Sequence, residues 1–179
     1  EAGYMYNNTN GSIYPTRGFV FNLGAGGLKN LADTGSSFAK INSSAAVYLP
    51  IRNAFTFAMR AGGATVFGDP DFYHLIRLGG NMEMRGFERE RFYGKSIFYT
   101  NTEIRWLTDT RNYFYNGKIG LVGFYDIGRV WMPGEKSSLW HAGYGTGLVL
   151  IPFNKVTLTA MYGLSKEGDN LFFRGEMFF

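Results

Sequence analysis

The sequence predicts an all-β fold, a transmembrane antiparallel up-and-down β-barrel with about eight strands in this chain. Three observations carry this prediction: eight segments alternate with period two, aromatic residues gather at the segment ends, and the charged residues inside the segments share one face. No stretch approaches the roughly 18 consecutive apolar residues of a membrane-spanning helix. Segment length and alternation instead match the roughly ten-residue strands of outer-membrane barrels.

The eight segments follow one another along most of the chain. They lie at residues 19–26, 39–49, 55–62, 98–106, 119–128, 143–150, 156–163 and 170–179. A shorter fragment, residues 3–7, precedes a turn at residues 8–16. We therefore expect one barrel domain over residues 1–179, in which residues 1–15 form a partial strand or a linker.

The first three segments set bulky apolar side chains against small or polar ones. Residues 19–26 place Phe, Leu and Ala opposite Asn and Gly. Residues 39–49 place Ala, Ile, Val and Leu opposite Lys, Asn, Ser and Tyr, and residues 55–62 place Phe, Met and Ala opposite Thr, Arg60 and Gly. A face of Gly, Ser, Asn and charged residues suits a wet lumen better than a dry core.

The later segments repeat this pattern, and their polar face also carries charged residues. The polar face carries Glu103 in residues 98–106, Asp126 in residues 119–128, and Arg174 and Glu176 in residues 170–179, while Gly and Thr fill it in the two segments between. A Lys or Arg at mid-bilayer on the lipid face costs about 2–4 kcal/mol. The alternation spares the barrel this cost, because it turns all of these charges toward the lumen.

Aromatic residues crowd the segment ends, as in the interfacial girdles of membrane barrels. These residues are Tyr4, Tyr6, Tyr14, Phe92, Tyr93, Tyr113, Phe114, Tyr115, Trp131, Trp140, Phe178 and Phe179. A soluble β-sandwich or lipocalin-like barrel alternates equally well. The aromatic ends and the poor apolar content of the second face favour the membrane barrel.

The connections alternate between short turns and longer loops, of which residues 67–95 form the longest. In membrane barrels the short turns are periplasmic and the long loops extracellular. Arg85 lies on this long loop, whereas Asp126 interrupts an otherwise apolar strand. A loop arginine and a strand carboxylate on the lumen face predict a loop that folds into the barrel and is held there by an ion pair.

Several motifs give the chain a resemblance to the C-terminal barrel of the BamA/TamA, or bacterial surface antigen, superfamily of outer-membrane insertases and transporters. In chain order they are Tyr14-Pro15-Thr16-Arg17-Gly18, Leu78-Gly79-Gly80-Asn81 with Met84-Arg85-Gly86-Phe87, Asn101-Thr102-Glu103-Ile104-Arg105, and residues 123–131 with Asp126-Ile127-Gly128. Each resembles a family motif in the expected strand or loop. Together they cover most of the chain.

The resemblance implies a loop–lumen latch, which we define as Arg85, Gly86 and Phe87 of the loop with Glu103, Asp126 and Gly128 of the strands. Arg85 would pair with Asp126 and Glu103, because a guanidinium group forms a planar fork suited to carboxylates. The alternative is that Arg85 is solvated and the two acids pair with Arg60, Arg105 or Arg174.

The last segment resembles the family's assembly signal, which ends on an aromatic residue with apolar residues at alternate positions. Phe173, Met177 and Phe179 supply these positions. The small residue of the signal falls one place off, at Gly175. The resemblance thus implies recognition of this end by the barrel assembly machinery.

Family barrels have sixteen strands, so the resemblance implies that this chain supplies about half of one. Its expected partners are outer-membrane lipid, the barrel assembly machinery, and either the missing N-terminal half or a second copy. We expect a place in the outer membrane of a Gram-negative bacterium and a role in outer-membrane protein insertion or polypeptide translocation. The alternatives are a barrel that anchors an upstream enzyme domain and a small structural barrel.

The sequence predicts no enzyme, no cofactor, no metal site and no nucleic-acid partner. It contains no Cys, and His74 and His141 lack the spacing of a metal site. No Gly-x-Ser-x-Gly elbow is present, and residues 23–27 resemble a phosphate loop only in their glycines. The net charge of +4 is spread evenly along the chain, without a basic cluster.

Overall fold

The computed structural model describes residues 1–11, 14–29, 37–52, 54–80, 83–111, 116–134 and 138–177. These residues form eleven strands and one short 3₁₀ helix. In chain order they are β1 (Ala2–Asn7), β2 (Gly18–Leu28), β3 (Phe38–Arg52), β4 (Phe55–Gly68), η1 (Phe72–His74), β5 (Ile76–Leu78), β6 (Phe92–Gly94), β7 (Ser96–Arg111), β8 (Asn116–Trp131), β9 (His141–Pro152), β10 (Val156–Ser165) and β11 (Gly168–Met177).

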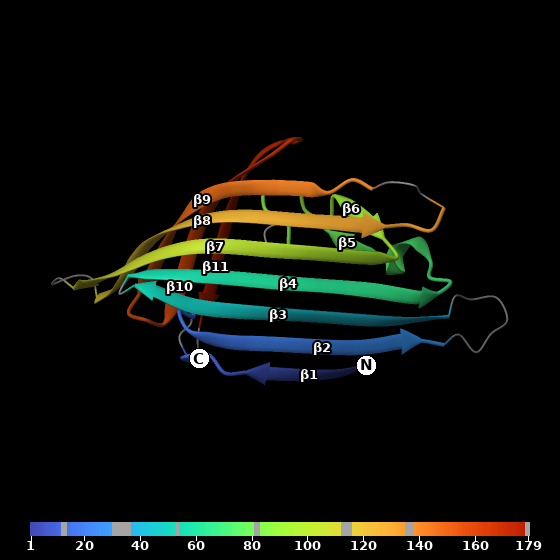
Figure 1. Ribbon diagram of the computed structural model, residues 1–179, viewed down its shortest axis with the longest axis horizontal. Helices are drawn as coiled ribbons and strands as arrows, with labels where there is room; N and C mark the ends of the chain where they lie inside the picture. Colours follow the sequence, from blue (N-terminus) through green and yellow to red (C-terminus); the bar gives the residue numbers. More distant parts are fainter. Residues whose placement is uncertain are drawn as a thin grey trace.

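Nine of the strands form one antiparallel sheet in the order β1-β2-β3-β4-β7-β8-β9-β10-β11. Each strand pairs with the next one of this order, as in an up-and-down barrel, and β1 and β11 are the two edges of the sheet. The sheet is strongly curled, so that β10 and β11 pass behind β3 and β4 in the view of Figure 1. Strands β5 and β6 form a separate two-stranded sheet within the loop that joins β4 to β7.

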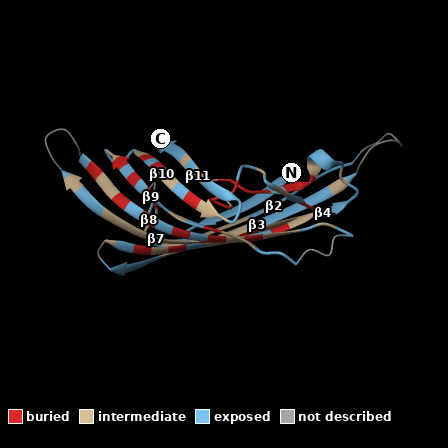
Figure 2. Cartoon of the chain, turned by 90° about the horizontal axis from the view of Figure 1, so that it is seen from above, coloured by how far each residue is buried: buried red, intermediate tan, exposed pale blue. Residues whose placement is uncertain are grey.

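The alternation in the sequence becomes the two faces of this curled sheet (Figure 2). On β8, Leu121 and Tyr125 are exposed, whereas Val122, Phe124 and Asp126, which alternate with them, are buried on the concave face. The same parity recurs in the neighbouring strand, where Ile104 is exposed. A large number of other apolar side chains on the convex face are exposed as well, which is the arrangement that a lipid-facing surface needs.

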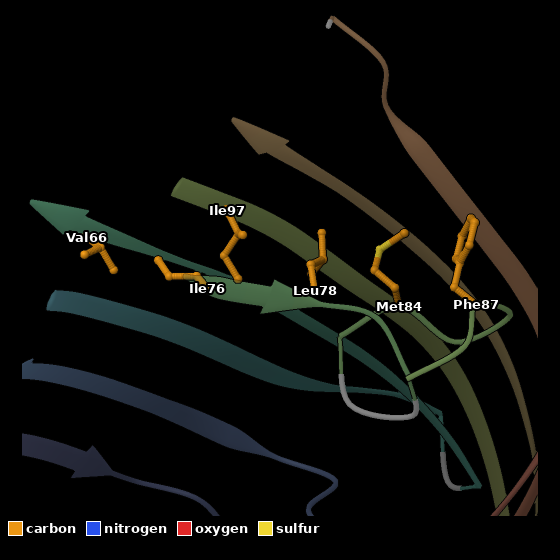
Figure 3. Close-up of a cluster of buried hydrophobic side chains, with 6 residues drawn as sticks. All are labelled: Val66, Ile76, Leu78, Met84, Phe87 and Ile97. Atoms are coloured by element: carbon orange, nitrogen blue, oxygen red, sulfur yellow. The ribbon is translucent and has the colours of Figure 1, made fainter. Parts of the chain in front are cut away.

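The concave face is covered by the loop between β4 and β7, residues 69–95. Six side chains form an apolar cluster there, two of them from the strands and four from the loop: Val66, Ile97, Ile76, Leu78, Met84 and Phe87 (Figure 3). Leu78 and Met84 have no exposed surface. The loop is therefore packed into the sheet as a core element, which fixes the position of the residues between Met84 and Phe87.

The structure differs from the sequence expectation at Tyr14. Expected at an aromatic girdle, Tyr14 instead lies inside the curl, where it packs against Val122, Val149 and Ile151 of β8 and β9. The physical reason is that the segment before β2 folds inward over an apolar patch of the concave face. Five other predicted girdle residues, Tyr113, Phe114, Tyr115, Phe178 and Phe179, lie outside the described residues.

Residues 1–15, expected to be a partial strand or a linker, include β1, which pairs with β2 from Ala2 opposite Ala25 to Asn7 opposite Val20. Among the described residues, no helix combines the length and the apolar character needed to cross a membrane.

A charge on the convex face tests the assignment of the two faces. Ile104 is 45% exposed near the middle of β7, opposite Gly123 of β8. Replacing Ile104 with Arg is expected to lower the free energy of unfolding in lipid vesicles by about 2–4 kcal/mol, because it places a charge at mid-bilayer. Thr108→Arg, on the same face near the end of the strand, is expected to cost only about 0–1 kcal/mol. Equal losses for both variants in a urea titration would contradict the assignment.

Candidate functional site

The candidate site is the place where the loop reaches the concave face of β7 to β10. The chain turns sharply at Gly86, which has a φ of +93° and can adopt this conformation without strain. A β-carbon on Gly86 would lie 2.7 Å from the carbonyl oxygen of Leu164 in β10. Gly86 therefore serves both the turn and the close approach of the loop to the sheet.

Glycines on the strands form the surface on which the loop rests. A β-carbon on Gly163 would lie 2.6 Å from the backbone nitrogen of Gly86, and one on Gly128 would lie 2.6 Å from the sulfur of Met84. A β-carbon on Gly143 would overlap the carbonyl oxygen of Arg85. Three neighbouring strands thus leave out their side chains where the loop backbone lies, which fixes its depth in the curl.

Arg85 and Asp126 form the centre of the site. Asp126 has no exposed surface, and it accepts three hydrogen bonds from Arg85. Its Oδ2 accepts from the backbone N–H of Arg85 at 2.9 Å and from Nε at 2.8 Å, and its Oδ1 accepts from Nη2 at 2.7 Å. This bidentate pairing fixes both the loop backbone and the plane of the guanidinium group.

Arg85 also contacts β7, β8 and β10 through the rest of its guanidinium group. Nη1 donates a hydrogen bond to Oε1 of Glu103 and lies 3.7 Å from the sulfur of Met161. The guanidinium carbon lies 4.0 Å from the centre of the Phe124 ring, a cation–π distance. Burial by itself lowers the pKa of Arg85, but the hydrogen bonds to Asp126 and the charge of Glu103 outweigh it and raise this pKa above its ordinary value.

Glu103 is shared between two arginines. Its second oxygen, Oε2, accepts a hydrogen bond from Nε of Arg105 at 2.6 Å. Pairing of Glu103 with Arg105 was the alternative that the sequence left open, and the structure shows it together with the Arg85 contact rather than in place of it. Two cations, Arg85 and Arg105, thus balance two carboxylates, Asp126 and Glu103, in a largely buried network.

A second group of contacts holds the loop one strand further along the sheet. The side-chain amide of Asn101 donates to the carbonyl oxygen of Glu83 at 2.8 Å, and its oxygen accepts from Nε of Arg60 at 3.1 Å. Asn101 lies opposite Asp126 in the β7–β8 pairing. The two neighbouring residues therefore bind the loop backbone at Glu83 and at Arg85.

Beside Arg85 the curl holds a partly open cavity of about 210 Å³, lined by both charged and apolar side chains. It is lined by residues of β3, β4, β7, β10 and β11 together with Tyr14 and Arg85. Arg174 and Glu176 of β11 contribute a further ion pair at its wall. The lumen face assigned from the sequence to Arg60, Glu103, Asp126, Arg174 and Glu176 is thus the face that the structure gives them.

The other predicted site residues lie in the loop cluster, on the convex face, or outside the described residues. Phe87 is buried in the loop cluster, and its ring centre lies 5.3 Å from that of Phe92. Phe173 and Met177 lie exposed on the convex face of the edge strand β11, whereas Phe179 lies outside the described residues. Asn81 of the Gly-Gly motif also lies outside them.

The two histidines contact aromatic rings. His74 in η1 lies 4.3 Å from the Phe38 ring centre, and His141 is stacked on Phe92 at 3.8 Å. Within the described part of the chain, no three His, Cys, Asp or Glu side chains gather in a way that would hold a metal ion.

Sequence reasoning missed Asn101, Phe124 and Tyr14 as contributors to the site, and it named Arg105 only in the alternative pairing of the two acids. Parity alone placed Arg105 and Asn101 on the lumen face, but it does not say which loop atoms they meet. The motif that includes Tyr14 marked its segment without showing that the segment folds inward.

We expect the carboxyl group of Glu83 to make the stability of the docked loop depend on pH. Burial raises its pKa above the ordinary value of 4.5, against opposing effects of Arg60, its own backbone and Arg89. Because the pKa of Glu83 is raised in the folded state, the neutral carboxyl favours the folded state over the unfolded one. Its contribution to the free energy of unfolding is fully present below the ordinary pKa and is lost as the pH rises through the raised pKa. We therefore expect Glu83→Gln to raise the urea midpoint at pH 7 and to leave it unchanged at pH 4. Glu88→Gln, an exposed change on the same loop, is the control; a lower midpoint for Glu83→Gln at pH 7 would contradict the expectation.

Comparison with known proteins agrees with this architecture. The Omp85 superfamily domain matches residues 1–158. Among solved structures, the chain is similar to BamA from Haemophilus ducreyi lacking POTRA domains 1-3, with a TM-score of 0.75 and 18% sequence identity. The match covers 98% of this chain and 41% of that chain, so this chain spans less than half of the BamA chain. No curated protein matches the sequence.

Proposed function

Because the chain belongs to the Omp85 superfamily, we propose that it acts in the insertion of outer-membrane proteins or the translocation of polypeptides, in the outer membrane of a Gram-negative bacterium. One observation carries the proposal: a loop enters the concave face of a superfamily barrel and is fixed there by the buried pair of Arg85 and Asp126. Such a loop determines what else occupies the lumen.

The proposal assigns no bond-breaking chemistry to these residues. Arg85 fixes the loop across the concave face of β7, β8 and β10, so a polypeptide that passes through the lumen needs the loop to leave first. In an insertion role the loop would instead stay in place and stiffen the wall of the barrel. In both roles the latch acts by fixing the position of the loop in the lumen.

The proposed partners follow from the two edges of the sheet and from its convex face. Unpaired backbone groups in hydrocarbon cost several kcal/mol each, about the penalty for burying a polar group without a hydrogen bond. We propose that further strands or a second copy pair with β1 and β11, that lipid covers the convex face, and that the barrel assembly machinery recognises Phe173, Met177 and Phe179.

Depletion of the protein from cells tests the proposed function. For an insertion role we expect a loss of folded outer-membrane barrels, measured by heat-modifiable gel mobility. For a translocation role we expect exported polypeptides to accumulate in the periplasm while the other barrels remain normal.

Normal levels of both after depletion would overturn the proposal. This result would favour the alternatives of an anchor for an enzyme domain or a structural barrel. A loss of hydrolytic activity from the outer membrane on depletion would distinguish the anchor from the structural barrel.

A further inference from the structure

The Tyr14 segment, residues 14–17, enters the curled sheet at the end opposite the long loop. It leads into β2 at Gly18, near the end of β3 and the start of β4. The long loop between β4 and β7 leaves from the other end of β4, at Gly68. Tyr14 is only 8% exposed and packs against Val122, Val149 and Ile151. Burial raises the pKa of Tyr14 to about 12, against the charge of Arg105.

Arg105 binds the Tyr14 segment to β7. Its Nη1 donates a hydrogen bond to the carbonyl oxygen of Pro15 at 3.0 Å, and its guanidinium carbon lies 4.1 Å from the centre of the Tyr14 ring. A second ring, Tyr48, lies 5.3 Å away. These contacts fix the plane of the guanidinium group, which also donates from Nε to Glu103.

Glu103 thereby joins the two segments that enter the curl from its two ends. Its Oε1 accepts from Arg85 of the loop, and its Oε2 accepts from Arg105, which holds the Tyr14 segment. The Glu103 and Arg105 side chains are 12% and 11% exposed. A chain of direct contacts therefore runs from Pro15 through Arg105 and Glu103 to Arg85.

We propose that Glu103 couples docking of the Tyr14 segment at one end of the barrel to docking of the loop at the other. When Tyr14 and Pro15 are in place, Arg105 is oriented, and its hydrogen bond to Oε2 of Glu103 holds Oε1 toward Arg85. When they leave, Arg105 loses two of its contacts and water enters, which weakens the electrostatic attraction between Glu103 and Arg85. The coupling is reciprocal, so displacement of the loop also loosens the Tyr14 segment.

Trypsin cleavage after Arg85 measures loop release, because this bond is buried when the loop is docked. The cleavage rate is proportional to the fraction of molecules in which the loop is released, when loop opening and closing are fast relative to cleavage. We would measure it by mass spectrometry on the protein in isolated outer membranes. Tyr14→Leu keeps an apolar side chain against Val122 and Val149 but removes the ring that faces Arg105, whereas Tyr14→Phe keeps the ring.

We expect Tyr14→Leu to raise the cleavage rate by about fivefold or more, the lower end of typical coupling between sites. Tyr14→Phe, which keeps the ring against Arg105, is expected to raise the rate less than Tyr14→Leu does, and the exposed change Arg17→Ala is expected to leave the rate unchanged. In a Glu103→Gln background, the effect of Tyr14→Leu should disappear. If Tyr14→Leu does not assemble, Arg105→Lys, which keeps the charge but loses the planar contacts, takes its place with the same expectation.

An unchanged rate in folded Tyr14→Leu would overturn the proposal. An equal increase in the native and Glu103→Gln backgrounds would overturn it too, because the effect would then be a general loosening that does not pass through Glu103. This readout does not depend on the proposed function, so either can fail alone.

Discussion

Replacing Asp126 with Ala is expected to lower the free energy of unfolding of the barrel by about 3–5 kcal/mol, the typical cost of breaking a buried ion pair. The variant removes the acceptor of three hydrogen bonds from Arg85. The Arg85 side chain, 5% exposed, would then retain Glu103 as its one carboxylate partner among the described residues. Urea titration of the protein in lipid vesicles measures the change.

Asp109→Ala provides the control for Asp126→Ala. Asp109 lies on the neighbouring strand, its side chain is 84% exposed, and its Oδ1 lies 3.6 Å from Nζ of Lys118. Exposed ion pairs contribute about 0–1 kcal/mol, so this variant should unfold nearly as the native protein does. Similar behaviour of the two variants would show that the Arg85 pair does not stabilise the barrel.

Gly143→Val is expected to expel the loop from the curl. The added β-carbon would overlap the carbonyl oxygen of Arg85, and this backbone atom cannot move away while Arg85 holds Asp126. Overpacked cores typically lose about 1–3 kcal/mol, and a backbone obstacle places this variant at or above the upper end of that range. We expect trypsin to cleave after Arg85 in the folded variant, where the native protein is protected.

Gly123→Val is the matched control, because a β-carbon on Gly123 meets no atom within 4 Å. Gly123 lies on the convex face of β8. The Gly123→Val variant should keep the loop protected from trypsin. Protection of the loop in Gly143→Val would contradict the close packing of the loop against β9.

The sequence predicted the fold class because membrane barrels impose alternation on every strand. The antiparallel sheet and its match to the BamA fold confirm the barrel prediction, and the matched domain confirms the resemblance to the BamA/TamA superfamily. The inward parity of Glu103 and Asp126 could be counted along the strands, since a one-residue shift reverses the face. The resemblance supplied the loop arginine as their partner.

The details of the site depend on tertiary packing that alternation does not encode. Tyr14 has the sequence context of a girdle residue, and its inward position depends on the apolar patch of Val122, Val149 and Ile151 across the curl. The glycine face of β9 was predicted, but contact between Gly143 and the loop backbone requires the depth at which the loop rests. Arg105 has the right parity, and its two further partners come from a segment about 90 residues away along the chain.

A double-mutant cycle tests whether Arg85 and Asp126 stabilise the barrel as a pair. The cycle compares Arg85→Met, Asp126→Ala and the double variant by urea titration in lipid vesicles. We expect a coupling energy of at least about 2 kcal/mol, within the range for residues in one buried network. Additive effects within about 0.5 kcal/mol would contradict it, because the two residues would then act independently.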